Sequence, residues 1–123
     1  MKKQARRTGV QRIAAERKRQ IAKLGWSAEH DDMHDGSELA WAAICYAAPD
    51  QVFIKDARHA YVRFYDPFPW DSGDDARSDP PTGFVTKART PEAHRLRLLE
   101  KAGALIAAEI DRLLRVEQKR GRE

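Results

Sequence analysis

The feature that most constrains this chain is a long apolar periodicity near its C-terminus. Thr90-Pro91-Glu92 places a capping residue, a first-turn proline and an early acid in the order that opens a helix. Apolar side chains then recur at helical spacing to about Glu117, at Leu96, Leu99, Ala102, Leu105, Ile106, Ile110 and Leu113. A helix of roughly 27 residues would be about 40 Å long. We therefore expect a mainly α chain organised around this helix.

A shorter helix is expected near the N-terminus, over about residues 8–24, with Gly25 as its stop signal. One of its faces is apolar, at Val10, Ile13, Ala14, Ile21 and Leu24. Residues 1–23 carry nine Lys or Arg side chains against Glu16 alone, although the net charge of the chain is only +4. The basic segment from Lys2 to Arg19 therefore favours either nucleic-acid binding through charge or an ordinary solvated helix.

A second helix is expected over residues 36–48, because this segment is apolar on nearly every side. Asp35 and Glu38 have the spacing of a capping box at its start. Trp41 and the single cysteine, Cys45, lie within it and are expected in the core. With the N-terminal and C-terminal helices, it completes a predicted three-helix core.

The segment between the second and the long helix changes character. Residues 52–54 and 61–65 are β-branched and aromatic, which favours a short hairpin. A proline-rich aromatic turn over 66–71 and a polar loop over 72–81 follow. This segment is predicted to be a loop or hairpin insertion between the second and third helices.

The whole chain of 123 residues is long enough for one domain. We expect a basic arm at 1–7, a single helical domain over 8–118 with the insertion at 50–90, and a basic tail at 119–123. No apolar run approaches the roughly 20 residues that span a bilayer, and a lone cysteine suits a reducing compartment. These observations predict a cytoplasmic protein without a membrane partner.

The densest group of potential metal ligands is His30-Asp31-Asp32-Met33-His34. On a helix, residues four apart share a face, so both imidazoles would reach one cation. His30, Asp31, His34 and Glu38 are therefore candidate ligands for Mg²⁺ or Mn²⁺, and the two imidazoles would shift the preference toward Mn²⁺ or Zn²⁺. The alternative is structural: the carboxylates lie near a helix N-terminus and pair with basic side chains of the first helix.

Two tryptophans, Trp26 and Trp70, are expected on turns, and Ser27 has the chemistry to cap a short turn after the first of them. An aromatic ring on a turn either stacks on a nucleobase or covers the end of a small core. Phe68 and Trp70, in the proline-rich turn, are also candidates to anchor a protein partner.

Several segments together resemble a group of small phage and prophage proteins. The segments are 16–21 (Glu-Arg-Lys-Arg-Gln-Ile), Gly25-Trp26, 29–32, 36–40 and 101–112. The same order is similar, at a greater distance, to the MazG-like all-α nucleoside triphosphate pyrophosphohydrolases. In that family an E-R-x-x-Q helix precedes a metal-binding helix, and a long helix closes the domain.

The resemblance implies Mg²⁺ held by paired carboxylates on two helices, with Glu38 in the first set and Glu100 near the second. Where the family carries its further carboxylates, this chain has Ser37, Trp41, Leu98 and Lys101. Arg17 or Arg19, on the first helix, would then contact phosphate.

The sequence leads us to expect one of three functions. The leading one is a phage-type accessory protein that binds a divalent metal and a nucleotide on a degenerate MazG-like scaffold, in the cytoplasm of the host cell. The second is a non-catalytic inhibitor of a host defence protein, and the third is nucleic-acid binding through the basic N-terminal helix. The small residues of 102–108 would serve either a homo-oligomer or packing within one chain.

Overall fold

In the computed structural model of the chain, residues 6–58, 60–70, 77 and 91–122 are described. They form four helices and a two-stranded antiparallel sheet, in the order α1 (Gly9–Leu24), α2 (Ala28–Asp32), α3 (Glu38–Ala47), β1 (Ile54–Asp56), β2 (Arg63–Tyr65) and α4 (Pro91–Gly121). The predicted mainly α fold, with a hairpin before a long C-terminal helix, is confirmed. The predicted cap Thr90, most of the polar loop and residues 1–5 of the basic arm lie outside the described residues.

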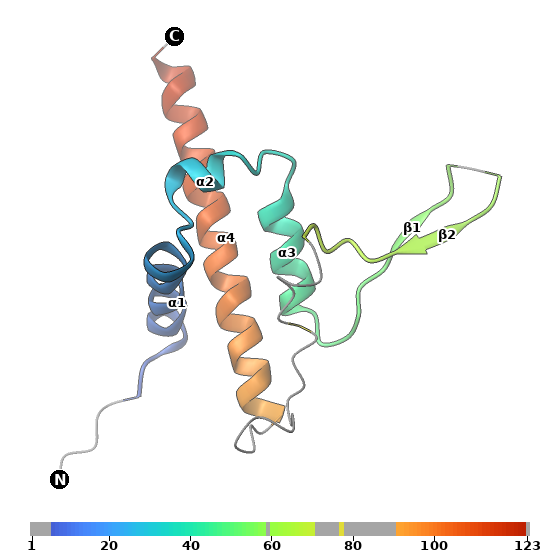
Figure 1. Cartoon of the computed structure of the whole chain (residues 1–123), viewed down its shortest axis with the longest axis horizontal. Helices are drawn as coiled ribbons and strands as arrows, with labels where there is room; N and C mark the ends of the chain where they lie inside the picture. The colour runs from blue at the N-terminus through green and yellow to red at the C-terminus, as the bar shows by residue number, and fades with distance from the viewer. Residues whose placement is uncertain (1–5, 59, 71–76, 78–90, 123) are drawn as a thin grey trace.

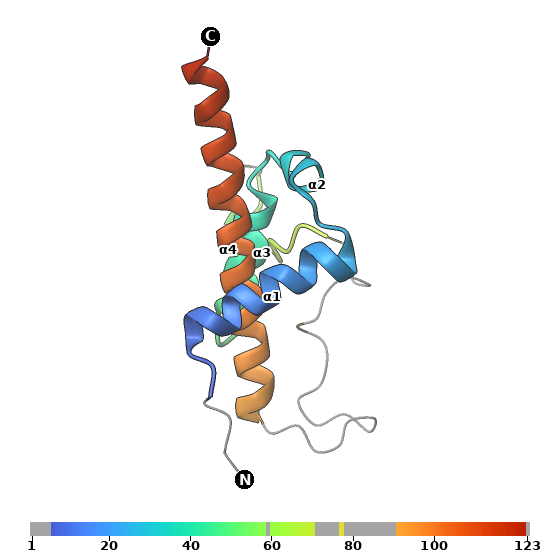
Figure 2. The ribbon, with the colours of Figure 1, turned by 90° about the vertical axis from the view of Figure 1, so that its left-hand side faces the viewer.

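The long helix α4 is the axis of the molecule. In Figure 1, α3 and α1 lie on its two sides, and Figure 2 shows α1 crossing it steeply. The apolar core lies between α3 and α4 and consists of Leu39, Ala42, Ala43, Tyr46, Ala102, Leu105 and Ala108. Small residues let the two backbones approach closely, so the alanine-rich part of α4 packs within the chain.

The crossing of α1 over α4 depends on a glycine. A Cβ atom added to Gly103 would lie 2.5 Å from Cδ1 of Ile13, which is closer than two carbon atoms can approach. Ile13 belongs to the apolar stripe predicted for the first helix. The absence of a side chain on Gly103 therefore lets α1 rest directly on α4.

The ends of the first two helices agree with the sequence. Thr8 caps α1 through a capping box, accepting from the Gln11 backbone N–H while its own N–H donates to the Gln11 side chain. Gly25 ends α1 in the left-handed conformation, with φ of 71°. Ser27 then caps α2 by accepting a hydrogen bond from the backbone N–H of His30.

The capping box predicted at the start of α3 is wrong. The N-cap residue is Ser37, which has φ of 69° and makes no side-chain capping hydrogen bond. The left-handed turn at Ser37 starts the helix at Glu38, two residues later than expected, so Asp35 is not at the N-cap. Glu38 instead accepts hydrogen bonds from His34 and from backbone N–H groups.

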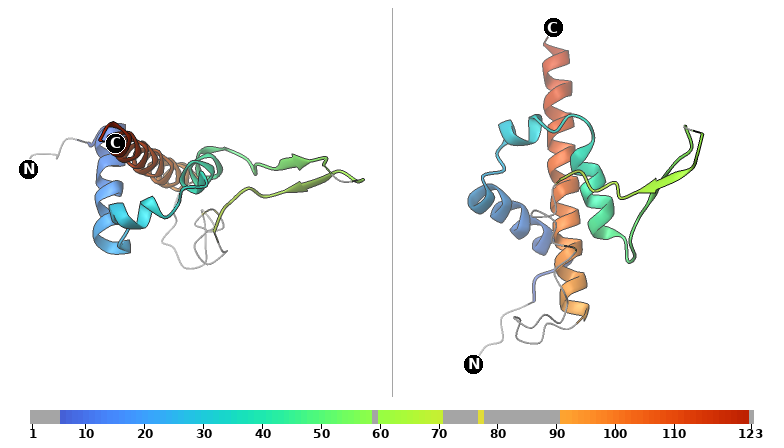
Figure 3. Two further views of the ribbon diagram at one scale, coloured as in Figure 1. Left: turned by 90° about the horizontal axis from the view of Figure 1, so that it is seen from above. Right: turned by 45° about the vertical axis from the view of Figure 1, so that its right-hand side comes forward.

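The predicted hairpin is confirmed, with its strands slightly later in the chain than the apolar runs. Ile54 pairs with Tyr65, and Asp56 pairs with Arg63. Figures 1 and 3 show the hairpin extending away from the helices on the α3 side. Asp56 is buried beside Arg58 and Arg63, and hydrogen bonds from Arg58 hold the pKa of its carboxyl well below the ordinary value.

The helices also test the predictions about the core residues Cys45 and Trp41 and about the basic tail. Cys45 is buried as expected, whereas Trp41 is only half-buried. The helix α4 continues to Gly121, so the predicted basic tail is mostly helical.

In the described part of the chain, no helix has both the length and the apolarity to cross a membrane.

Candidate functional site

The short helix α2 is held in place by its two aspartates. Asp31 is fully buried and accepts a 2.6 Å hydrogen bond from Nη2 of Arg17 on α1. Asp32 accepts from Arg115 of α4 at 2.8 Å, and these hydrogen bonds lower the pKa of Asp32. Asp31 therefore pairs with a basic side chain of the first helix, as the structural alternative predicted. Asp32 pairs with α4 instead.

The two histidines of the predicted metal cluster lie side by side. Their ring centres are 4.9 Å apart and the ring planes are inclined by 69°. The Nδ1 atom of His30 lies 3.1 Å from Oδ1 of Asp31, and the Nδ1 atom of His34 lies 3.1 Å from Oε2 of Glu38. Each imidazole is thus oriented by one carboxylate of the predicted ligand set.

The protonation of Glu38 is affected by these contacts. Partial burial favours its neutral form, but hydrogen bonds from His34 and from the backbone N–H groups of Gly36 and Glu38 outweigh that effect. The pKa of Glu38 is therefore lowered, and the group remains a carboxylate that orients His34.

Aromatic rings surround the histidine pair. Trp26 stacks on His30 with ring centres 5.6 Å apart and planes inclined by only 4°, and Trp70 meets His34 at 5.7 Å. The two tryptophan rings are 5.8 Å from each other. These four side chains line a hollow of about 240 Å³. We call it the aromatic hollow.

The proline-rich turn supplies one wall of the aromatic hollow. Phe68 packs edge-on against both Trp70 and Tyr46, at 5.8 and 5.6 Å, and so connects the hollow to the core. Both Phe68 and Trp70 are half-buried and pack against the core cluster. The turn therefore covers one end of the core, while Trp70 also lines the aromatic hollow.

A second hollow adjoins the first and has Trp26 as a shared wall. Its volume is about 450 Å³, and it is lined by Glu16, Arg19, Gln20, Leu24, Trp26, Tyr46, Lys101 and Leu105. A third hollow of about 320 Å³ shares Glu16 and Arg19 with the second and adds Arg7, Arg12, Ala15, Arg97 and Glu100. Neighbouring hollows in this series of three share lining residues, and the lining changes from aromatic to charged along it. We call the series the Trp26 cleft.

The charged end of the Trp26 cleft is organised by Glu16. The residue is 3% exposed, and its carboxylate accepts from Arg19 at 2.8 and 2.9 Å, while Arg97 lies 2.6 Å and Lys101 3.8 Å away. Burial would raise its pKa, but the hydrogen bonds and charges of these cations lower it to about 2. The second and third hollows together have five cationic side chains and two carboxylates, Glu16 and Glu100, so the region favours anions.

Gln20 is an unsatisfied buried group in the same cleft. It is 1% exposed, and its Nε2 donates to Glu16 at 3.3 Å. The amide oxygen has no hydrogen-bond partner among the described residues. Flipping the amide would place two oxygens face to face, so the oxygen points away from Glu16. A buried acceptor without a donor costs about 1–3 kcal/mol, which a ligand that donates a hydrogen bond would relieve.

The two arginines predicted to contact phosphate have different surroundings. Arg19 lines the second and third hollows. Arg17 is 14% exposed and donates to Asp31, and its Nε and Nη1 atoms are buried without a partner in the described residues. Arg19 is therefore the one of the two that faces the cleft.

The resemblance to MazG-like enzymes assigns Glu38 and Glu100 to two sets of metal ligands, but the two carboxylates have different partners. Glu38 contacts His34, whereas Glu100 contacts Arg12 and Arg97. Within the ranges that the structure describes, no group of three or more His, Cys, Asp or Glu side chains is arranged to hold a metal.

Sequence reasoning singled out Trp26, Arg19, His30, His34 and Trp70 but missed the roles of Glu16, Gln20 and Lys101. A signal for the first two was present. Glu16 and Gln20 are four residues apart and continue the stripe of Ile13, so they are polar side chains at positions where a packed helix normally buries apolar ones.

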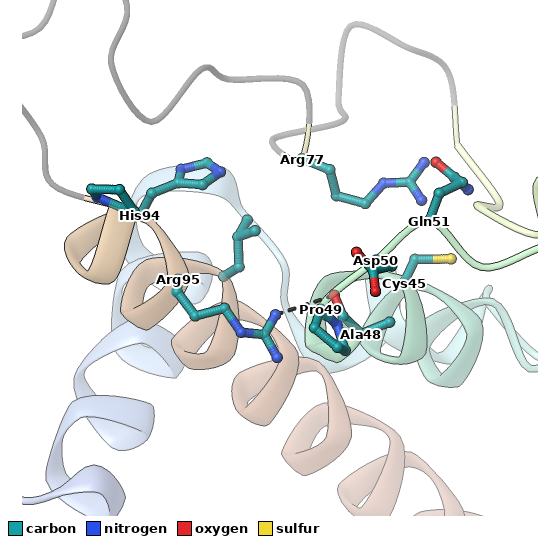
Figure 4. A pocket seen from close by; sticks show the side chains of 10 residues that line it. Cys45, Ala48, Pro49, Asp50, Gln51, Arg77, His94 and Arg95 are labelled. Atoms are coloured by element: carbon teal, nitrogen blue, oxygen red, sulfur yellow. Dashed lines mark hydrogen bonds between the residues drawn. The ribbon is translucent and has the colours of Figure 1, made fainter.

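A separate hollow at the end of α3, shown in Figure 4, has a structural explanation. Its Arg95 side chain, on α4, donates to the backbone carbonyls of Tyr46, Ala47 and Ala48. These carbonyls belong to the last turn of α3, where backbone acceptors lack helical partners. Arg95 therefore caps α3 from the neighbouring helix.

Comparisons of the chain with protein-family models, with curated proteins and with solved structures found no match.

Proposed function

We propose that this protein binds a nucleotide in the Trp26 cleft, with the base in the aromatic hollow and the phosphates at the charged end. The observation that carries the proposal is the position of Trp26, which lines both the aromatic hollow and the hollow that contains Arg19 and Lys101. A nucleotide has the same division between a flat aromatic part and an anionic part.

The aromatic end suits a base for energetic reasons. Stacking of a base on an aromatic side chain contributes about 1–3 kcal/mol and is largely independent of the base. Trp26 and Trp70 offer two such rings, and His30 keeps the Trp26 ring in place by stacking on it. This arrangement supports binding of nucleotides as a class, without strong preference for one base.

The charged end suits phosphate because its cations exceed its carboxylates. Arg19 and Arg97 already donate to Glu16, and guanidinium groups retain further donors for a second acceptor. The unpartnered oxygen of Gln20 would accept from a ribose hydroxyl or a base amino group in the second hollow. Such a role agrees with the resemblance to MazG-like enzymes.

Isothermal titration with a panel of nucleoside mono-, di- and triphosphates tests the proposal. We expect micromolar to millimolar binding that strengthens with the number of phosphates, because each adds charge. Trp26→Ala should weaken binding by about tenfold, and Arg19→Ala by a similar factor. Trp41→Phe and Lys18→Ala are matched controls, because neither side chain lines the cleft. Absence of heat with every nucleotide would refute the proposal.

The same samples also test the activity that the resemblance implies. Incubation of a bound triphosphate with Mg²⁺ or Mn²⁺, followed by separation of products, detects hydrolysis to a monophosphate. Monophosphate formation that Glu38→Gln abolishes would extend the proposal from binding to catalysis. Binding without turnover would leave a nucleotide-binding accessory protein.

A second candidate function, binding of a host protein, is supported by the hairpin. Tyr61 is 68% exposed and Phe64 is 64% exposed, and Phe53 and Val62 are more than half exposed beside them. Clustered exposed aromatic side chains are typical of protein interfaces. Loss of a stoichiometric host partner on Phe64→Ser, with Trp26→Ala retaining it, would favour this candidate over the nucleotide cleft.

A further inference from the structure

We infer that His30 and His34 form a two-histidine site for a borderline transition metal such as Zn²⁺, Ni²⁺ or Co²⁺, and not for Mg²⁺. The inference does not rest on the nucleotide proposal, because the metal is tested alone. It narrows the sequence-based expectation of Mg²⁺, Mn²⁺ or Zn²⁺ to metals that prefer nitrogen ligands, and it replaces the four expected ligands by the two histidines.

The spacing of the two rings fits a shared metal ion. A tetrahedral ion about 2.1 Å from one nitrogen of each of two imidazoles places the ring centres about 5 Å apart. The observed separation of the His30 and His34 ring centres is 4.9 Å. The ring planes are inclined by 69°, so the two rings do not stack face to face on each other.

The carboxylates select which nitrogen is available. Asp31 and Glu38 each lie 3.1 Å from an Nδ1 atom, where a carboxylate accepts the Nδ1 proton. A neutral imidazole that donates through Nδ1 has its lone pair on Nε2, which is the ligand atom. Carboxylate–histidine–metal arrangements of this kind fix the orientation of the ring toward the metal. Asp31 and Glu38 would therefore support the site instead of binding the metal directly.

Nitrogen ligands decide the class of metal. Mg²⁺ takes oxygen ligands and keeps several waters, whereas imidazole suits Zn²⁺, Ni²⁺ and Co²⁺. Each oxygen of the buried Asp31 carboxylate already has a partner within the fold, Arg17 for Oδ2 and His30 for Oδ1. Two protein nitrogens leave the remaining coordination positions to water or to an atom of a bound ligand.

The surrounding tryptophans provide a readout of occupancy. Trp26 stacks on His30 and Trp70 abuts His34, with ring centres 5.6 and 5.7 Å apart. An open-shell ion such as Ni²⁺ bound between the histidines would quench indole fluorescence at this range. The full chain, freed of metal by a chelator, is titrated with NiCl₂ while fluorescence is recorded, and calorimetry with ZnCl₂ gives an independent isotherm.

Three variants and one control decide the outcome. His34→Ala and His30→Phe should each weaken Ni²⁺ binding at least tenfold, and His30→Phe keeps an aromatic ring against Trp26. Glu38→Gln should weaken it severalfold, because it removes the orienting carboxylate. His94→Ala, in the separate hollow beside α3, should bind as the wild type does. Circular dichroism confirms that each variant remains folded.

Two results would overturn the inference. One is wild-type protein that shows neither quenching nor heat with Ni²⁺ or Zn²⁺ up to about millimolar concentration. The other is an unchanged isotherm in a folded His34→Ala variant. Displacement of bound Ni²⁺ by an equal concentration of Mg²⁺ would overturn the assigned metal class. Loss of metal binding with intact nucleotide binding would leave the nucleotide proposal standing.

Discussion

The two sides of α4 are packed by opposite chemistry. Toward α3, the buried side chains are apolar and small, with Leu39 and Leu105 as the largest fully buried members. Toward α1 and α2, the buried groups are Glu16, Gln20 and Asp31, all of them polar. The apolar side follows the ordinary rule for a protein core, whereas the polar side buries groups that cost free energy unless they are paired.

The difference indicates that the two sides of α4 have different roles in the molecule. A buried ion pair contributes little net stability compared with an apolar pair of similar size, but breaking it is costly. The polar side therefore fixes geometry more than it adds stability, and that side carries the Trp26 cleft. The α3–α4 side stabilises the fold on which the cleft is built.

Among the substitutions that test this comparison, Asp31→Ala should lower the free energy of unfolding the most. The substitution leaves the buried guanidinium of Arg17 without its carboxylate, which should lower the free energy of unfolding by about 3–5 kcal/mol. Asp32→Ala is the matched control and should cost much less, because its pair with Arg115 is more exposed. Urea unfolding measures both, and equal costs would contradict the assignment of Asp31 as a buried anchor.

On the apolar side, Leu39→Ala should lower the free energy of unfolding by about 2–5 kcal/mol. Leu39 is fully buried between α3 and α4, so its removal leaves a cavity. Nucleotide and metal affinity should be unchanged in protein that remains folded. A specific loss of ligand affinity, measured well below the unfolding midpoint, would contradict the division between the two sides.

Acid should weaken the polar side through Glu16. The folded-state pKa of Glu16 is about 2, below the ordinary 4.5, so the unfolded chain binds a proton first as the pH falls. Its stabilising contribution, up to about 3 kcal/mol, is fully present above pH 4.5 and is lost as the pH approaches 2. Glu16→Gln should flatten the pH dependence of unfolding in that window. A Glu16→Gln curve parallel to that of the wild type would contradict the prediction.

The smallest of these effects is expected where α1 rests on α4. Gly103→Ala places a Cβ against Ile13 and should cost about 1–2 kcal/mol, although alanine is the better helix former. The double variant Gly103→Ala, Ile13→Val should recover part of that loss, because valine is shorter toward the contact. An increase in stability on Gly103→Ala alone would show that α1 shifts freely on α4.

Local signals predicted the fold well because they act within a few residues. Thr8, Gly25 and Ser27 cap helices by contacts with their immediate neighbours, and the periodicity of α4 needs no knowledge of its partners. Ser37 was missed because its left-handed conformation is unusual for a residue other than glycine.

The candidate site was predicted only in part, because many of its contacts join residues that are far apart in the sequence. The histidine pair was visible as a local motif, but the roles of Asp31 and Glu38 as partners of Nδ1 atoms depend on how α2 and α3 start. The cluster around Glu16 joins α1 to α4 through Arg97 and Lys101, which are more than eighty residues away in the sequence. The sequence pattern of neither helix predicts that contact.

The shared wall at Trp26 has a thermodynamic consequence. A metal that fixes His30 also restrains the indole stacked on it, and the same indole bounds the hollow beside Arg19. Any free-energy coupling between two ligands of one protein is reciprocal, so a cation that tightens nucleotide binding must itself be held more tightly by the nucleotide-loaded protein. Measured in both directions, the two affinity ratios must be equal.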